Sequence, residues 1–153
     1  MQCTIYALGE KKWRTSLDRV LVLARKGEKL ILHRDELNAL WELPEKALVR
    51  GESRDETARA ALGEAIGEAV FDVSILCAYT ITGEDGRESG GYCYTADVRE
   101  WQGGEESKSQ AFDRLPLASQ IKNPALVFAL HKWAGEFFDR RLEIERLGQP
   151  APY

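Results

Sequence analysis

The sequence predicts one domain of the mixed α/β class, with a mixed β-sheet held between helices. Three observations support this prediction: two strand-like hairpins, two helical segments that alternate with them, and a length of 153 residues, close to the usual size of one domain. Hydrophobic residues make up 44% of the chain and charged residues 30%, as in ordinary globular proteins. We expect the domain to span residues 1–147 and the tail 148–153 to fray.

Four segments have the composition of strands. Asp18–Lys26 and Lys29–Arg34 are β-branched and aliphatic runs separated by a Gly-Glu turn, which predicts a hairpin of two largely buried strands. Val70–Thr82 and Tyr92–Val98 predict a second, long hairpin around the glycine-rich, charged loop Gly83–Gly91.

The first helix has the clearest local signal in the sequence. Ser53 and Glu56 fit the S-x-x-E capping box, which satisfies free backbone donors at a helix start, so we expect a helix from Arg54. Gly67 suits the left-handed position just after its end. The helix places one apolar stripe against the core. The residues of this stripe are Ala58, Ala61, Leu62, Ala65 and Ile66.

A second helix is expected from Pro124 to about Leu147, because Asn123 is a good N-cap and proline is favoured at the first helical position. Its apolar residues recur at helical spacing, which predicts that it covers the sheet. They are Leu126, Val127, Leu130, Trp133 and Phe137.

Charge and composition exclude several classes of function. The net charge of −4 and the pI near 5.3 argue against a nucleic-acid polymer as partner, although a nucleotide needs only a local basic site. No apolar run approaches the length of a membrane span, and the N-terminus lacks the apolar core of a signal peptide, so we expect a cytoplasmic protein that does not bind membranes.

The three cysteines do not have the spacing of a zinc site, and we expect them to be reduced and structural. Cys77 and Cys93 lie about equally far from the turn of the second hairpin and could face each other across it. A disulfide there is the less favoured outcome in a reducing compartment.

The segment 41–68, WELPEKALVRGESRDETARAALGEAIGE, resembles the Nudix box G-x5-E-x7-R-E-U-x-E-E-x-G-U, where U is aliphatic. The hairpins on either side and the F-x-x-L-P loop before the last helix also fit this family, so the resemblance covers most of the chain. The resemblance implies the Nudix α/β/α sandwich. Within the family, the chain is most similar to the small bacterial, MutT-like branch that acts on nucleoside triphosphates. An ungapped alignment places these residues at positions of the box: Lys46 at the opening glycine, Glu52, Leu62, Glu64 and Gly67.

The box is degenerate. Ala60 stands at the arginine, Ala61 at the glutamate after it, and Ala65 at the second of the paired glutamates. Glu68 takes the last aliphatic position and Glu45 replaces the other turn glycine.

In the family, glutamates of the box helix hold Mg²⁺ (or Mn²⁺) against a diphosphate. Positions 61, 64 and 65 share one flank of a helix, and only Glu64 is still acidic there, so we expect ordinary turnover to be very slow or absent. Glu64 and Glu52 are therefore the candidate catalytic residues, and Glu64 is the candidate metal ligand. Glu52 also complements the positive end of the helix dipole.

Other acids could complete a metal site. Glu68 lies four residues after Glu64 and would share its face if the helix continued, and the hairpin loop adds Glu84, Asp85 and Glu88. All of these are equally well explained as solvated surface charges.

A phosphorylated ligand could be bound without a metal. Lys46, Arg50, Arg54 and Arg59 cluster around the box turn and helix, although scattered basic surface residues are the plainer explanation. Trp41, Tyr79 and Tyr92 could stack on a base, but aromatic residues on strands more often pack in the core. His33 and His131 are read as structural.

Two functions follow. The first is a Nudix-like domain with impaired hydrolysis that binds a nucleotide-type diphosphate ligand or a protein partner. The second is a Mg²⁺-dependent hydrolase of nucleoside triphosphates or of nucleoside diphosphates linked to another group, with a rearranged metal site. A homodimer is compatible with either function.

Overall fold

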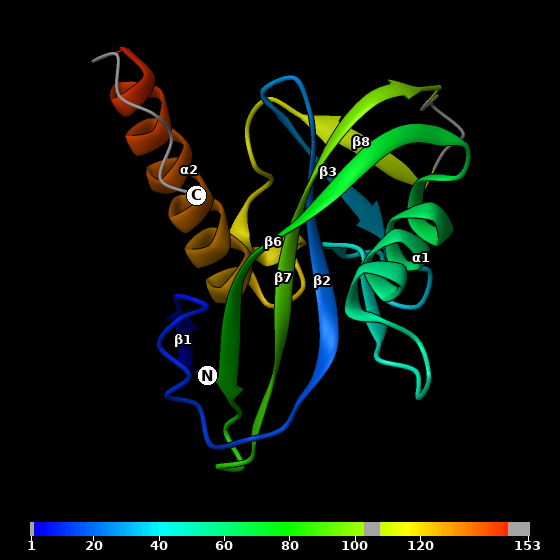
Figure 1. Cartoon of the computed structure of the whole chain (residues 1–153). Helices are drawn as coiled ribbons and strands as arrows, with labels where there is room; N and C mark the ends of the chain where they lie inside the picture. Colours follow the sequence, from blue (N-terminus) through cyan, green and yellow to red (C-terminus); the bar gives the residue numbers. More distant parts are fainter. Residues whose placement is uncertain (1, 103–107, 147–153) are drawn as a thin grey trace.

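The computed structural model describes the backbone of residues 2–102 and 108–146. Within these residues an eight-stranded sheet lies between two helices, α1 (Arg54–Ile66) on one face and α2 (Pro124–Arg146) on the other (Figure 1). The predicted α/β/α sandwich with a mixed sheet is therefore confirmed. No helix among the described residues is long and apolar enough to cross a membrane.

The sheet has the order β1-β6-β7-β2-β3-β4, while β5 pairs with β2 and β8 pairs with β3. The strands are β1 (Gln2–Tyr6), β2 (Leu17–Lys26), β3 (Lys29–Arg34), β4 (Trp41–Glu42), β5 (Glu45–Ala47), β6 (Ala69–Thr82), β7 (Glu88–Trp101) and β8 (Ser109–Phe112). A short 3-10 helix, Ala118–Gln120, precedes α2.

One parallel pair, β2 with β7, makes the sheet mixed. The two strands approach closely near Gly91, where a Cβ atom would lie 2.4 Å from the carbonyl oxygen of Arg19. Since real Cβ atoms do not come so near to a backbone oxygen, this contact requires glycine. The beginning of β2 thus lies beside β7 of the long β6–β7 hairpin, while β5 pairs with the other edge of β2.

The segment β4–β5 carries the box turn and is fixed to the sheet on two sides. β4 pairs with β3, and β5 pairs with the beginning of β2, with Val20 opposite Lys46. Between the two short strands, Pro44 is buried and its carbonyl accepts a 2.9 Å hydrogen bond from the backbone N–H of Val22. The turn before α1 therefore has a defined position against the sheet.

Helix α1 begins and ends where its sequence signals predict. The Oγ of Ser53 accepts the N–H of Glu56 at 3.1 Å, and Gly67, at φ 76°, stops the helix. Ala58, Ala61 and Leu62 are buried against the sheet. The core on this side also contains Val20, Val22, Ala24, Ile31, Ile66, Tyr94, Ala96 and Val98.

Helix α2 covers the opposite face, as predicted. Leu126, Val127 and Leu130 are buried, and Trp133 is partly buried. The side chain of Phe137 lies outside the described residues, as does the tail 148–153. The core on this side also contains Leu21, Leu23, Leu30, Leu32, Leu43, Cys77, Tyr79, Cys93, Ile121 and Ala134.

The short strands β1, β4, β5 and β8 were not predicted as strands, and β7 is longer than predicted. β1 and β8 were not predicted, because each is short and joins an existing strand, β6 or β3, without a hairpin turn of its own. β7 begins at Glu88 rather than Tyr92, so the predicted loop Gly83–Gly91 is a tighter turn of residues 83–87. Pairing with β6 extends the strand through its glycines.

The prediction that Cys77 and Cys93 face each other is confirmed. They are directly opposed in the β6–β7 register, and both are fully buried and free.

Candidate functional site

The candidate site lies where β5 meets α1. Successive residues of a strand point to opposite faces, so β5 directs Lys46 towards α1 and Glu45 away from it. The Nζ of Lys46 lies 2.6 Å from Oε1 of Glu64, a charge-assisted hydrogen bond between β5 and α1. Glu45 pairs instead with Arg19 of β2. The one glutamate retained on the metal flank of the box is therefore occupied by a lysine.

Both carboxylates retained from the box act on Lys46. The hydrogen bond to Glu64 raises the pKa of Lys46, burial opposes this increase, and the charges of Glu64 and Glu52 add to it. The side chain of Lys46 is 28% exposed, whereas that of Glu64 is 65% exposed. Lys46 is therefore the less exposed side chain of the pair, and its ammonium group stays protonated throughout the physiological range.

Ala61 and Ala65, the alanines that the sequence alignment puts at glutamate positions of the box, differ in environment. Ala61 is only 3% exposed and faces the core, while Ala65 is partly exposed. The backbone carbonyl of Ala65 accepts a 2.6 Å hydrogen bond from Oγ of Ser109. Position 61 thus shares a flank with Glu64 by helical spacing, but the packing of α1 turns it towards the sheet.

The remaining candidate metal ligands are not brought to Glu64. Glu68 follows the left-handed Gly67, so the helix does not continue and Glu68 does not share its face. Glu84, Asp85 and Glu88 lie at the tip of the β6–β7 hairpin, whereas β6 starts three residues after α1 ends. A strand of 14 residues extends about 45 Å, which places this tip far from the end of α1 (Figure 1).

The hairpin acids also have local roles. Oδ1 of Asp85 accepts the backbone N–H of Arg87 at 3.0 Å, and its other oxygen lies 3.7 Å from the Nε of Arg87. Glu88 is paired with Thr82 as the first residue of β7.

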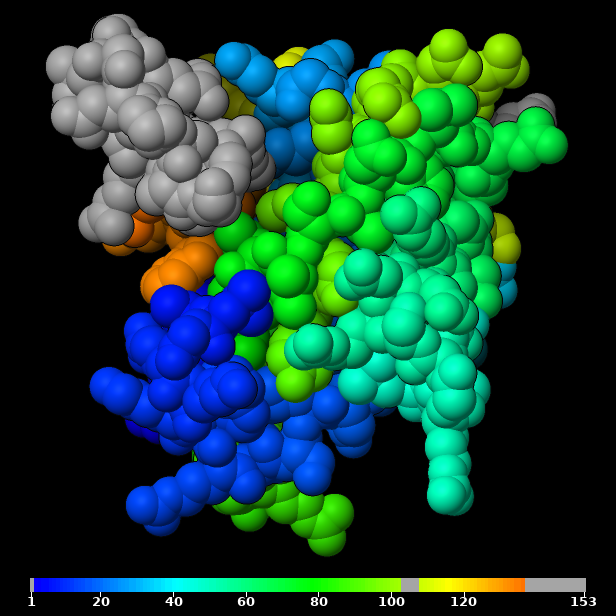
Figure 2. All heavy atoms as spheres, viewed as in Figure 1, coloured from blue at the N-terminus to red at the C-terminus, as the bar shows by residue number. Residues whose placement is uncertain are grey.

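The basic candidates other than Lys46 lie on the outer side of the domain. Arg50 and Arg59 are exposed, and α1 together with the loop before it forms one side of the molecular surface (Figure 2). The guanidinium of Arg54 lies 4.4 Å from the ring centroid of Tyr92, so this aromatic face is covered by a cation from the same molecule.

Trp41 has a packing role. Its ring contacts Phe112 edge to face, with centroids 4.9 Å apart, and Arg34 lies 4.5 Å from its centroid. Its backbone carbonyl accepts the N–H of Lys122. These contacts place Trp41 in the α2 side of the core, on the face of the sheet opposite to Glu64.

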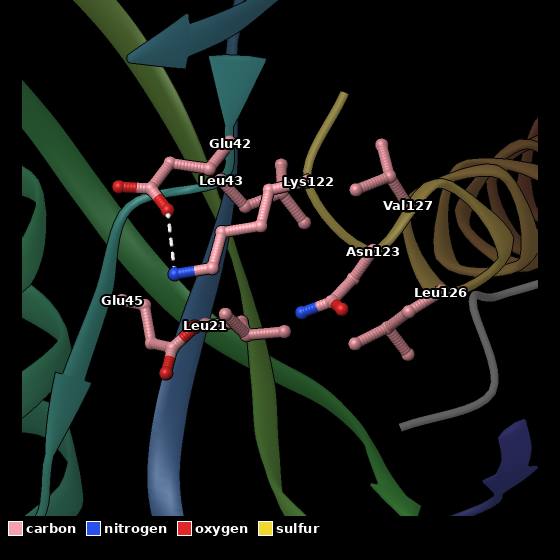
Figure 3. Close-up of a pocket in the computed structure, with 8 residues that line it drawn as sticks. All are labelled: Leu21, Glu42, Leu43, Glu45, Lys122, Asn123, Leu126 and Val127. Carbon is pink, nitrogen blue, oxygen red and sulfur yellow. Dashed lines mark ion pairs between the residues drawn. The ribbon is translucent and has the colours of Figure 1, made fainter. Parts of the chain in front are cut away.

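A small pocket lies between β5 and the start of α2, and it was not predicted from the sequence (Figure 3). Its floor is apolar, and its rim carries both charges, with Glu42 Oε2 3.4 Å from Nζ of Lys122. The amide of Asn123 points from the start of α2 towards β2 (Figure 3). The pocket is lined by Leu21, Glu42, Leu43, Glu45, Lys122, Asn123, Leu126 and Val127.

No protein-family model matches the sequence, and no curated protein matches it. Solved structures do. A mutant of the pyrophosphohydrolase BsRppH from Bacillus subtilis superimposes with a TM-score of 0.67 at 23% identity, over 88% of this chain and 90% of that one. A NUDIX hydrolase from Nitrosomonas europaea gives a TM-score of 0.62 at 12% identity, over 79% and 90% of the two chains. The chain has the Nudix fold.

A UDP-X diphosphatase is also similar, with a TM-score of 0.54 and 18% identity over 82% of this chain and 66% of that one. In this structure the segment 41–68 forms β4, β5, a loop and α1, and Glu64 lies on α1 where it contacts Lys46 of β5.

The donor set does not fit a resident divalent ion. No group of three or more His, Cys, Asp or Glu residues that could hold a metal occurs within residues 2–102 and 108–136, whose side chains are described. Glu64 is paired with an ammonium group, and Ala61 and Ala65 contribute no oxygen ligands. Magnesium requires near-octahedral oxygen coordination, which these side chains do not supply.

Proposed function

We propose that this Nudix-fold domain is impaired as a hydrolase and binds a nucleotide-type diphosphate ligand. The observation that carries the proposal is the pairing of Glu64 with Lys46 at 2.6 Å. In phosphoryl chemistry, catalysis rests on positioning and on charge stabilisation by metal ions and cationic groups. A domain that keeps one of three helix glutamates, and neutralises that one internally, lacks most of this machinery.

The pocket beside β5 has a volume of about 20 Å³, room for about one water molecule, so the proposal rests on the pair of Lys46 and Glu64 and not on this pocket. Small-molecule sites are concave and combine an apolar lining with a few polar groups that fix orientation. Here Leu21, Leu43 and Leu126 form the apolar part, and Asn123 offers both a donor and an acceptor. Glu45 lines this pocket, but Lys46, the next residue of β5, points to the other face of the sheet, so the pocket and the lysine are separate candidate sites.

Two measurements on the purified protein test the proposal. One follows release of phosphate or pyrophosphate from nucleoside triphosphates, nucleotide sugars and dinucleotides with Mg²⁺ or Mn²⁺. The other follows binding of the same compounds by calorimetry. We expect binding without turnover. A rate above about 0.1 s⁻¹, compared with the usual enzyme range of about 1 to 1000 s⁻¹, contradicts impairment, and failure of every compound to bind contradicts the ligand class.

A second candidate is a Mg²⁺-dependent hydrolase of nucleoside triphosphates or of nucleoside diphosphates linked to another group. It is favoured by the 65% exposure of Glu64 and by the nearness of Glu52, whose charge also acts on Lys46. Magnesium that arrives with a nucleotide needs only one or two protein carboxylates. The Glu64→Gln variant distinguishes the two: it abolishes turnover if this candidate is correct. Glu68 and the hairpin acids supply no ligand in either proposal.

We also infer that the domain works in a reducing compartment, the cytoplasm. The support is that Cys77 and Cys93 are free although they are directly opposed in the sheet.

A further inference from the structure

The box position that is normally an opening glycine carries a lysine here, and its ammonium group lies beside the carboxylate that would hold the metal. We propose that Lys46 replaces the divalent cation of the site: it neutralises Glu64 and binds the phosphate oxygens of a diphosphate ligand without a metal. This inference rests on the proposed ligand class, but it adds the residue that binds the diphosphate and the independence from divalent cations.

The position of the ammonium group is fixed from both sides. Lys46 is held by the pairing of β5 with β2, where it lies opposite Val20. Glu64 is held by α1, whose last turn is fixed by a 2.9 Å hydrogen bond from Nε1 of Trp101 to the carbonyl of Ile66. Each partner therefore belongs to an element with independent anchors, so the charge is preorganised.

The chemistry of an ammonium group suits this role. It has three N–H donors, and Glu64 occupies one of them at 2.6 Å, which leaves donors for phosphate oxygens. A divalent ion approaching Glu64 would meet a positive charge of the protein itself and would have to displace it, so the lysine also excludes the metal.

Two other arginines near this site, Arg54 and Arg19, do not compete for this role. Arg54 lies over the ring of Tyr92, whereas Arg19 is paired with Glu45 on the other face of β5. Lys46 is thus the basic residue that the structure places directly against the retained box glutamate.

Calorimetry with inorganic pyrophosphate and with a nucleoside diphosphate tests the proposal. The wild-type protein should bind both probes in EDTA and should gain no affinity when Mg²⁺ is added. Lys46→Met should weaken binding about tenfold or more, since it removes a charge-assisted contact, and Lys46→Arg should restore much of it. The matched control is Lys29→Met, which breaks the Lys29–Asp113 ion pair at the start of β3 and should leave binding unchanged.

Binding that requires Mg²⁺, or that survives Lys46→Met, overturns the inference and leaves the proposed ligand class intact. A second measurement uses only the wild-type protein and no phosphate ligand, so it tests the inference even if a Lys46 variant fails to fold. Mn²⁺ broadens NMR resonances near its binding site, and in the wild-type protein it should not selectively broaden the amides around Glu64. Selective broadening of these amides would show that a divalent ion binds at Glu64 and would overturn the proposal that Lys46 takes its place. If the probes do not bind at all, the proposed function fails, whatever the Mn²⁺ result.

Discussion

The hydroxyl of Tyr94, on the central strand β7, donates a 2.6 Å hydrogen bond to Oδ1 of Asp55 in the first turn of α1. Tyr94 is 1% exposed, so this bond links the core of the sheet to the beginning of the box helix. At the other end of the helix, Trp101 bonds the carbonyl of Ile66. Both ends of α1 are therefore held by strand side chains, and its position does not depend on a bound metal.

Replacing Tyr94 with phenylalanine should destabilise the domain by about 1.5 kcal/mol, because the bond has a charged acceptor and lies at the edge of the core. For a chain of this size, the melting temperature should fall by about 3–6 °C. Tyr6→Phe is the matched control, since its hydroxyl makes only a 3.4 Å, partly buried contact with Thr80. Equal shifts in the two variants, measured by thermal unfolding, would contradict the role of Tyr94.

Alkaline pH should destabilise the fold. Burial raises the pKa of Tyr79, and burial together with the bond to Asp55 raises the pKa of Tyr94. Above about pH 10 the unfolded chain loses these protons while the folded chain keeps them, so stability is full below that pH and is lost as the pH rises further. The urea midpoint at pH 8 and near pH 11 measures the effect. Tyr94→Phe should flatten this pH dependence. A wild-type urea midpoint that rises between pH 8 and pH 11 would refute the predicted destabilisation.

The features predicted correctly from the sequence are those with local signals. The capping box at Ser53 and the stop at Gly67 define α1 through contacts a few residues apart. The two hairpins likewise follow from apolar runs around turns. β1 and β8 were missed because their strand character comes from pairing with residues far along the chain, as with Gln2 opposite Thr82.

The site could be predicted only in part, for a physical reason. Helical spacing places positions 61, 64 and 65 on one flank of α1, but it does not determine which of these residues is buried against the sheet and which faces solvent. Burial of Ala61 is decided by the packing of α1 on β2. The pair formed by Lys46 and Glu64 joins residues 18 apart through the insertion of β5 into the sheet, a contact that no local pattern encodes.

The thiols should differ in reactivity. The hydrogen bond with the thiol of Cys77, together with burial, raises the pKa of Cys93 well above its usual value; both side chains are fully buried, whereas Cys3 is partly exposed. A thiol reagent should therefore label one cysteine quickly in the native protein and all three in denaturant. Labelling of only one cysteine in denaturant, without reductant, would reveal a disulfide and contradict the free pair.

Restoring the box glutamates should affect stability differently at the two positions. Ala61→Glu places a carboxylate among the buried apolar side chains on the α1 side of the core and should destabilise the fold by about 3 kcal/mol or more. Ala65→Glu changes a partly exposed position and should cost less than about 1 kcal/mol. Denaturant midpoints of the single variants measure the contrast.

The contrast decides which variant can test the proposed impairment of hydrolysis. If Ala61→Glu unfolds the protein, absence of activity in that variant says nothing about the ligand pocket. Ala65→Glu combined with Lys46→Gly then becomes the informative variant, because it frees Glu64 from its ion pair and adds a second carboxylate beside it. If Ala61→Glu is instead as stable as the wild-type protein, α1 can turn position 61 towards solvent, and the burial of that flank is not what prevents a metal site.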